Sequence, residues 1–264
     1  MTLVMDIGNT NIKLGLFEGS TLAQSWRVSA SKSRTADELG VMVGNLFASV
    51  GLTFRDVDGV IMASVQPALN YTVEHACEYY IGKKPLVVNT FADTGLKFLY
   101  TNPEELGADR IVNAIAAFRE YGGPCVIVDC GTATTFSAVN SEGEFLGGAI
   151  APGIKASADA MTDVASKLPK IELIKPKNII GKSTISNMQS GVINGFTGLI
   201  NHILSEMLNE PSLKGAAVIA TGGLSELVDF DGRVKVIKDR ALSLKGLKII
   251  YDLNSERNNK IDKE

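Results

Sequence analysis

Residues 6–13 read DIGNTNIK, between the apolar stretches TLVM and LGLF. The two apolar stretches are typical of buried strands, and the polar segment between them is typical of a tight turn. Gly8 permits an unusual backbone angle and a close backbone approach, so amide groups of the turn can face phosphate oxygens. Lys13 adds a positive charge suited to the same oxygens, and Asp6 adds a carboxylate suited to Mg²⁺. The segment therefore predicts a phosphate-binding strand–turn–strand unit.

Two other interpretations of this segment are weaker. A Walker A loop ends in GKS or GKT and leads into a helix, and neither feature occurs here. An ordinary Asn-rich hairpin with a capping Asp needs only two turn residues. The segment instead holds six residues that are polar or Gly, and Asn9, Thr10 and Asn11 supply neutral hydrogen-bond donors. We therefore expect a nucleotide phosphate site.

A related pattern recurs in the second half of the chain. Residues 129–135 read DCGTATT after the apolar stretch PCVIV, so VMDIGNT and IVDCGTA share an apolar pair and Asp-x-Gly-polar-small. Asp129 suits a metal ion and Thr132 a phosphate, although a Thr-rich β-turn is the alternative. Similar strand–turn–strand units in both halves indicate an internal duplication with a cleft between the halves. We predict two domains, 1–117 and 118–264.

The pattern along the chain favours an α/β fold. Strands are expected at 22–28, 58–65, 85–89, 124–129, 136–140, 143–148 and 216–221, and they alternate with helices at 35–50, 67–81, 111–121, 191–208 and 247–260. The stretch from 150 to 184 holds three prolines and allows no clear prediction.

Composition narrows the class of protein. The chain has 264 residues, of which 45% are apolar and 21% charged, an ordinary soluble globular balance. A net charge of −3 gives no sign of a nucleic-acid footprint. Three cysteines without a CxxC pair are expected to be buried small hydrophobic residues. No apolar run reaches the roughly 18 residues of a membrane helix, and the N-terminus does not resemble a signal peptide, so we predict a cytoplasmic protein.

Residues 107–110 read GADR and precede a helical run. Asp109 suits a helix N-cap, but it also suits a base that accepts the proton of an attacking hydroxyl. Arg110 can bind a substrate carboxylate through two parallel hydrogen bonds. The spacing alone leaves both interpretations open. The sequence TGG at 221–223 suits a backbone lying flat against a planar base, or a plain strand-end turn.

Taken together, these segments resemble the type III pantothenate kinase family. The segments that carry the resemblance span most of the chain: DIGNTNIK at 6–13, GADR at 107–110, DCGTATT at 129–135, GGAIAPG at 147–153, TGG at 221–223 and LKGL at 244–247. The resemblance implies the fold of the acetate and sugar kinase, Hsp70 and actin superfamily, with duplicated ribonuclease H-like (actin-like ATPase) domains whose mixed β-sheets are flanked by helices. It implies ATP-dependent phosphorylation of pantothenate to 4′-phosphopantothenate, the first step of coenzyme A biosynthesis.

The resemblance also implies the site residues and partners. ATP would be bound by Asp6, Ile7, Gly8, Asn9, Thr10, Asn11, Ile12, Lys13 and Thr132. Pantothenate would be bound by Tyr100, Gly107, Ala108, Asp109, Arg110 and Thr184, with Asp109 accepting the proton of the hydroxyl and Thr184 reaching across a homodimer interface. Asp129 would hold a monovalent cation, K⁺ or NH₄⁺, and Asp6 would hold Mg²⁺.

Three rival functions follow from the same fold. One is another kinase or phosphatase acting on a sugar, an acetate-like acid or polyphosphate, against which GADR argues. A second is a non-catalytic regulatory or transcription-coactivating relative, which would not need to keep Asp6, Lys13, Asp109 and Asp129. A third, an actin-like filament protein, is disfavoured because the chain is short. We therefore expect an enzyme that binds neither nucleic acid nor membrane.

Overall fold

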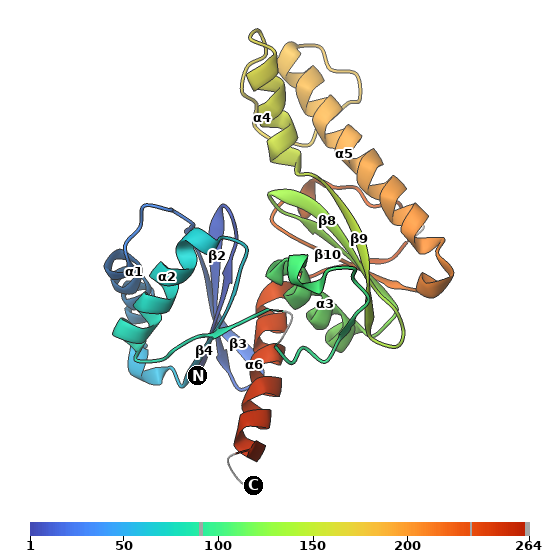
Figure 1. Cartoon of the computed structure of the whole chain (residues 1–264). Helices are drawn as coiled ribbons and strands as arrows, with labels where there is room; N and C mark the ends of the chain where they lie inside the picture. Colours follow the sequence, from blue (N-terminus) through green and yellow to red (C-terminus); the bar gives the residue numbers. More distant parts are fainter. Residues whose placement is uncertain (90–91, 233, 262–264) are drawn as a thin grey trace. The chain divides into compact units, whose positions relative to one another are not determined.

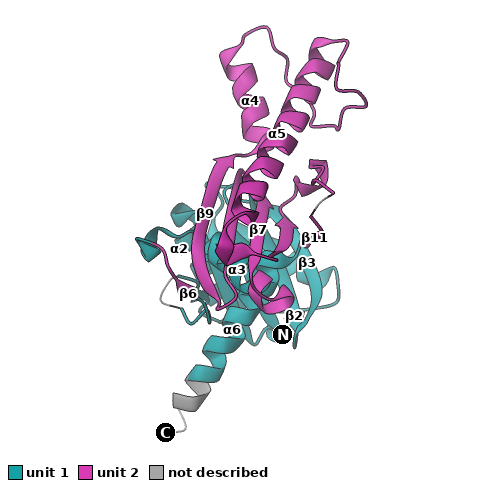
Figure 2. Cartoon of the chain, turned by 90° about the vertical axis from the view of Figure 1, so that its right-hand side faces the viewer, with its two compact units in different colours: residues 1–96, 101–116, 241–264 teal, residues 97–100, 117–240 magenta. Residues whose placement is uncertain are grey.

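The computed structural model describes residues 1–89, 92–232 and 234–261 (Figure 1). The chain divides into two compact units, shown in separate colours in Figure 2. Unit 1 comprises residues 1–96, 101–116 and 241–264, and unit 2 comprises residues 97–100 and 117–240. None of the helices in the described part of the chain has the length and apolar character that a membrane crossing requires.

Unit 1 is built on a five-stranded sheet of order β3-β2-β1-β4-β5. Its strands are β1 Thr2–Ile7, β2 Asn11–Glu18, β3 Thr21–Ser29, β4 Gly59–Ser64 and β5 Leu86–Val87. The strands β1, β2 and β3 form an antiparallel meander, whereas β4 lies parallel to both β1 and β5. The central strand β1 is buried along its whole length.

Helices cover both faces of this sheet. The helices α1 (Ala36–Ala48) and α2 (Pro67–Ala76) pack on one face, against a core that includes Leu3 and Met5 of β1. Thr35 begins α1 through a capping box with Glu38. The helix α6 (Leu242–Ile261) packs against β1, β2 and β4. Because side chains alternate along a strand, Asp6 points away from the core that Met5 enters.

Unit 2 is built on a six-stranded sheet of order β11-β10-β7-β8-β9-β6. Its strands are β6 Lys97–Phe98, β7 Cys125–Cys130, β8 Ala133–Val139, β9 Glu144–Pro152, β10 Ala217–Thr221 and β11 Val236–Lys238. The helices α4 (Ile154–Val164) and α5 (Thr184–Leu208) cover a core formed by side chains such as Val126, Val128 and Phe136. Asp129 alternates with these residues and therefore points to the other face of the sheet.

The two sheets share one topology, which confirms the predicted duplication. The order β3-β2-β1-β4-β5 in unit 1 matches β9-β8-β7-β10-β11 in unit 2. The strands β1, β2 and β3 in unit 1 and β7, β8 and β9 in unit 2 form antiparallel meanders. In both sheets the two last-named strands run parallel to the central strand, and β6 is an additional edge strand parallel to β9. Asp6 and Asp129 occupy the same place, one residue before the end of the central strand. The structure thus confirms the predicted α/β fold with two mixed sheets flanked by helices.

The structure corrects several element boundaries. The predicted polar turn at 6–13 is mostly strand, since β1 runs to Ile7 and β2 begins at Asn11. The helix expected at 67–81 ends at Ala76 and continues as a π-helical turn, Cys77–Ile81. The helix expected from 191 begins at Thr184, and that expected from 247 begins at Leu242. The short strands β6 and β11 were not predicted.

The compact units differ from two contiguous halves. The division at 116/117 lies close to the predicted boundary, but residues 241–264 belong to unit 1. The physical reason is that α6 packs directly on β2 of unit 1. Leu244 of α6 lies so close to Gly15 of β2 that a Cβ added at Gly15 would be only 3.1 Å from a Cδ atom of Leu244. The helix α3 (Ala108–Tyr121) begins in unit 1 and ends in unit 2.

Candidate active site

The turn between β1 and β2 is short and closed by its own backbone. Asp6 pairs with Lys13 and Ile7 with Ile12, and the Gly8 N–H donates to the Asn11 carbonyl at 3.0 Å. A Cβ at Gly8 would lie 3.1 Å from that carbonyl oxygen. Asn9 and Thr10 are exposed at the tip. The predicted phosphate segment therefore presents backbone and small polar side chains at the tip of a hydrogen-bonded hairpin.

Gln66 supports this turn and was not predicted from the sequence. It follows β4, is 4% exposed, and donates from Nε2 to the Asn9 carbonyl at 3.2 Å and to the Gly8 carbonyl at 3.5 Å. The N–H and C=O of a planar trans peptide point in opposite directions. The backbone N–H groups of Asn9 and Thr10 therefore point away from Gln66. Successive N–H groups turned to one side form an anion-binding concavity.

Asp6, Lys13 and Ser243 form a closed triangle of polar contacts. The Lys13 ammonium lies 3.1 Å from Oδ2 of Asp6, next to which the strand pairing places it. The Ser243 hydroxyl donates to the same Oδ2 at 2.7 Å and accepts from Lys13 Nζ at 3.3 Å. Asp6 and Ser243 are both buried. This charged pair is therefore held by a residue 230 positions beyond Lys13 in the sequence.

Asp109 lies in the first turn of α3. The Gly107 carbonyl accepts the first helical hydrogen bonds, from the N–H groups of Arg110 at 3.0 Å and Ile111 at 3.2 Å. Gly107 therefore holds the N-cap position, and the N-cap interpretation of Asp109 is wrong. The Asp109 carboxylate accepts from the Arg110 N–H at 2.8 Å. A Cβ on Gly107 would lie 2.5 Å from Oδ1 of Asp109, so a larger residue at position 107 would displace this carboxylate.

The electrostatics of Asp109 suit a base. Burial raises the pKa of its carboxyl, and the nearby charge of Asp6 raises it further. The Arg110 N–H bond and the Arg110 charge oppose this shift by lowering the pKa. A carboxylate that is partly desolvated binds a proton more readily than one in water. Asp109 thus belongs to the same electrostatic environment as Asp6.

The helices α3 and α6 approach each other closely within unit 1. A Cβ on Gly246 would lie 1.9 Å from the Val112 carbonyl oxygen, so only Gly allows the two backbones to approach this closely. This contact accounts for the Gly of the LKGL segment. Asp109 and Ser243 are each the second residue of their helix. The two helices therefore each bring a side chain from their first turn to the surroundings of Asp6.

The equivalent hairpin of unit 2 is packed by glycines. Asp129 pairs with Thr135 of β8 and Thr221 of β10. Gly222, with φ +87°, would place a Cβ 2.5 Å from Oδ1 of Asp129, and a Cβ on Gly153 would lie 2.1 Å from the Thr132 carbonyl oxygen. The TGG and GGAIAPG segments thus allow backbone to pack directly over this turn.

One buried hydroxyl beside Asp129 lacks a partner. Oγ1 of Thr221 is buried and makes no hydrogen bond in the described part of the chain. In-register pairing places its side chain on the same face of the sheet as Asp129. Carboxylate and hydroxyl oxygens suit a hard cation.

The other predicted substrate residues lie in unit 2. The Tyr100 ring meets Phe145 edge-on at 6.1 Å, and one of its carbons lies 4.0 Å from where a Cβ of Gly147 would be. Thr184 is the exposed first residue of α5, directly after the capping Ser183. Gly107 to Arg110 belong to unit 1. The roles of Tyr100 and Thr184 stay predictions.

The described residues contain no group of three or more His, Cys, Asp or Glu side chains that suits a metal ion. Mg²⁺ in phosphoryl-transfer sites needs only one or two carboxylates, because substrate phosphates and water supply the other ligands. Asp6, placed behind the phosphate turn, fits such an ion.

Comparison with known proteins shows the family to which the chain is similar. Residues 2–206 match the family described as type III pantothenate kinase. A type III pantothenate kinase of Brevibacillus brevis is 46% identical over 254 residues, which cover 96% of this chain and 99% of the relative.

Solved structures agree on the fold alone. A Campylobacter jejuni protein named for the Baf family of transcriptional activators superposes with a TM-score of 0.58 at 20% identity, covering 96% of this chain and 99% of that one. MreB 5 of Spiroplasma citri, bound to AMPPNP, superposes with a TM-score of 0.53 at 12% identity, covering 98% of each chain. The similarity to MreB 5 confirms the predicted actin-like fold class.

Proposed function

Because the chain belongs to the type III pantothenate kinase family, we propose that it transfers the γ-phosphoryl group of ATP to the primary hydroxyl of pantothenate. The products are 4′-phosphopantothenate and ADP, so the reaction is the first step of coenzyme A biosynthesis. The observation that carries the assignment of roles is the position of Asp109, a half-buried carboxylate close enough to Asp6 for the Asp6 charge to raise its pKa. A base and a phosphate-binding turn thus lie in one unit.

The residues divide the work of an in-line displacement. Asp109 orients the pantothenate hydroxyl and accepts its proton as the new oxygen–phosphorus bond forms and the bond to the ADP oxygen breaks. The amides at the turn and the Lys13 ammonium hold the phosphates and stabilise their charge. Asp6 would hold a Mg²⁺ bound together with the phosphates, and this ion would supply neutralisation of their charge. Arg110 is placed to bind the pantothenate carboxylate.

We assign a monovalent cation, K⁺ or NH₄⁺, to Asp129. The partnerless Thr221 hydroxyl and the tight backbone of Gly222 over the carboxylate support this assignment. Thr132, at the tip of the same hairpin, would bind a phosphate of ATP. We expect turnover to be faster in K⁺ than in Na⁺ at equal ionic strength. Equal rates in the two salts would contradict the role of Asp129.

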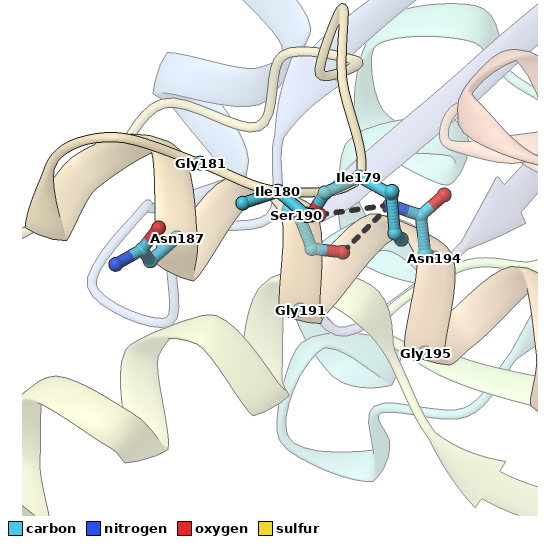
Figure 3. Close-up of a pocket in the computed structure, with 8 residues that line it drawn as sticks. All are labelled: Ile179, Ile180, Gly181, Asn187, Ser190, Gly191, Asn194 and Gly195. Carbon is cyan, nitrogen blue, oxygen red and sulfur yellow. Dashed lines mark hydrogen bonds between the residues drawn. The ribbon is translucent and has the colours of Figure 1, made fainter.

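A homodimer is the further expectation, and the surface of α5 supports it. A groove of about 740 Å³ lies beside the first half of α5 (Figure 3). Asn194 donates to the backbone carbonyl and the hydroxyl of Ser190 at 2.9 and 3.1 Å. The neighbouring Ile179 and Ile180 are exposed apolar side chains beside this groove. Thr184, the predicted contact across the interface, begins the same helix.

The dimer can be tested without disturbing the fold. A Cβ on Gly191 or Gly195 would meet no described atom within 4 Å, so a larger side chain there has room in one protomer. We expect Gly195→Arg to shift the mass in multi-angle light scattering from dimer to monomer with an unchanged melting temperature. A monomeric wild type, or a variant that still dimerises, would remove this surface as the interface.

The activity is tested by a coupled assay of ADP release with pantothenate, a hexose, acetate or no acceptor, followed by mass spectrometry of the product. We expect ADP release and a phosphorylated product with pantothenate alone. Phosphorylation of the hexose or acetate would favour another kinase of this fold, and nucleotide binding without any product would favour a non-catalytic relative. A kinase that consumes ATP is expected in the cytoplasm, and that location stays a prediction.

A further inference from the structure

Ser243 lies at the start of α6 and makes contact with both charged residues of the phosphate hairpin. It is 2% exposed, donates to Asp6 Oδ2 at 2.7 Å and accepts from Lys13 Nζ at 3.3 Å. A hydroxyl has one proton to donate and two lone pairs to accept with, so it can serve both partners at once. The hydrogen bonds therefore run in one direction, from the ammonium through the hydroxyl to the carboxylate.

This arrangement affects how freely Lys13 can bind a phosphate. Oδ2 of Asp6 receives two donors, the Ser243 hydroxyl and the Lys13 ammonium at 3.1 Å. When Lys13 turns toward a phosphate, the Ser243 hydroxyl still satisfies Oδ2. Without the hydroxyl, Lys13 would leave a buried carboxylate oxygen that has lost both of these donors, which is costly.

We propose that Ser243 is a positioning residue of the phosphate site: its hydroxyl holds Asp6 so that Lys13 can leave the carboxylate and bind the β- and γ-phosphates. The proposal rests on the proposed function only in taking the hairpin as a site for ATP. It extends the site to the last helix of the chain, which packs on the sheet through Leu244 and on α3 through Gly246.

The test measures nucleotide binding by calorimetry in three variants and the wild type. Ser243→Ala removes the hydroxyl, Ser243→Cys replaces it with a weak donor of similar size, and Ser243→Thr keeps it. A hydrogen bond to a charged group corresponds to a factor of about 10 to 100 in affinity. We expect Ala and Cys to weaken ATP binding by about 10-fold or more, and Thr to bind ATP more tightly than either.

A second arm separates positioning from a general structural role. Lys13 is assigned to the β- and γ-phosphates, so Ser243→Ala should weaken ATP but leave adenosine binding unchanged. In a Lys13→Met background, Ser243→Ala should have little further effect on ATP, because the two residues act through one contact. Equal loss for ATP and adenosine, or losses that multiply in the double variant, would overturn the proposal.

The same measurements keep the two proposals apart. Binding of ATP does not require pantothenate, so a wild type that binds ATP but does not phosphorylate pantothenate would contradict the proposed function alone. Unchanged ATP affinity in both Ser243→Ala and Ser243→Cys would contradict the role of Ser243 alone. If the Ala variant does not fold, the comparison of Cys with Thr decides the same point.

Discussion

Replacing Gly107 with Ala should move the proposed base without unfolding the protein. The added Cβ would lie 2.5 Å from Oδ1 of Asp109, whereas ordinary van der Waals contact begins at 3.4 Å. The carboxylate must therefore move by about 1 Å, away from the position where the Arg110 N–H now holds it at 2.8 Å. A displacement of about 1 Å at a reacting group lowers the rate by roughly 100-fold. We expect kcat to fall by about that factor.

The stability of this variant should change little. The φ angle of Gly107 lies outside the left-handed region, so Ala adopts the same backbone there. Ala is a poorer N-cap than Gly by up to about 1 kcal/mol, which corresponds to a melting temperature lower by no more than roughly 4 °C.

A matched control shows whether position decides the result. Gly44→Ala in α1 would meet only the Phe54 ring, at 3.4 Å, and should keep normal kcat. The assay is steady-state ADP release with both substrates varied, beside a thermal melt. A Gly107→Ala enzyme with normal kcat would refute the placement of Asp109 as base.

Three further predictions concern Asp109 and Asp129. Asp109→Asn should raise the melting temperature at pH 7, because burial raises the Asp109 pKa and the ionised carboxylate therefore disfavours the folded state. This gain should fade as the pH falls toward 3.8, the ordinary pKa of an Asp side chain. A variant less stable than wild type at pH 7 would contradict this prediction. The acid limb of kcat/KM for pantothenate should lie above pH 3.8, because Asp109 must be ionised to act as the base. Burial and the Asp6 charge raise the pKa of Asp109, and this effect exceeds the lowering by Arg110. A kcat/KM profile that stays flat down to pH 3.8 would contradict the assignment. Gly222→Ala should lower the melting temperature, because the residue has a φ of +87° and the added Cβ would lie 2.5 Å from Oδ1 of Asp129. It should also abolish any difference in turnover between K⁺ and Na⁺. A stable variant that still turns over faster in K⁺ would contradict this prediction.

The parts of the site that the sequence could predict are those with a local signal. The hairpin at Asp6 to Lys13 and its counterpart at Asp129 each combine an apolar strand, a Gly and polar residues within a few positions. This local pattern was enough to predict two strand–turn–strand units and, from their similarity, an internal duplication. Asp109 was also found from a short segment, but only the structure places it inside the helix rather than at the N-cap.

The residues that the sequence did not predict depend on contacts between distant segments. Ser243 reaches Asp6 because α6 returns to the first sheet, and this return depends on close packing at Gly246 and Gly15. Gln66 follows an apolar strand and carries no motif, so only the turn of Gly8 and Asn9 reveals its role. Hydrophobic periodicity locates helices but does not say which sheet a terminal helix covers. The sequence therefore could not predict that residues 241–264 belong to unit 1.

Transfer of label from [γ-³²P]ATP to pantothenate by wild type and by Asp109→Asn, beside ATP affinity for each, tests the central claim most directly. The substitution keeps the size of the side chain and an acceptor for the Arg110 N–H, but it removes the base. We predict labelled 4′-phosphopantothenate from wild type, a loss of about 10²- to 10⁴-fold in the variant, and ATP affinity that is largely unchanged. Near-normal transfer by Asp109→Asn, or no labelled product from wild type, would contradict the account.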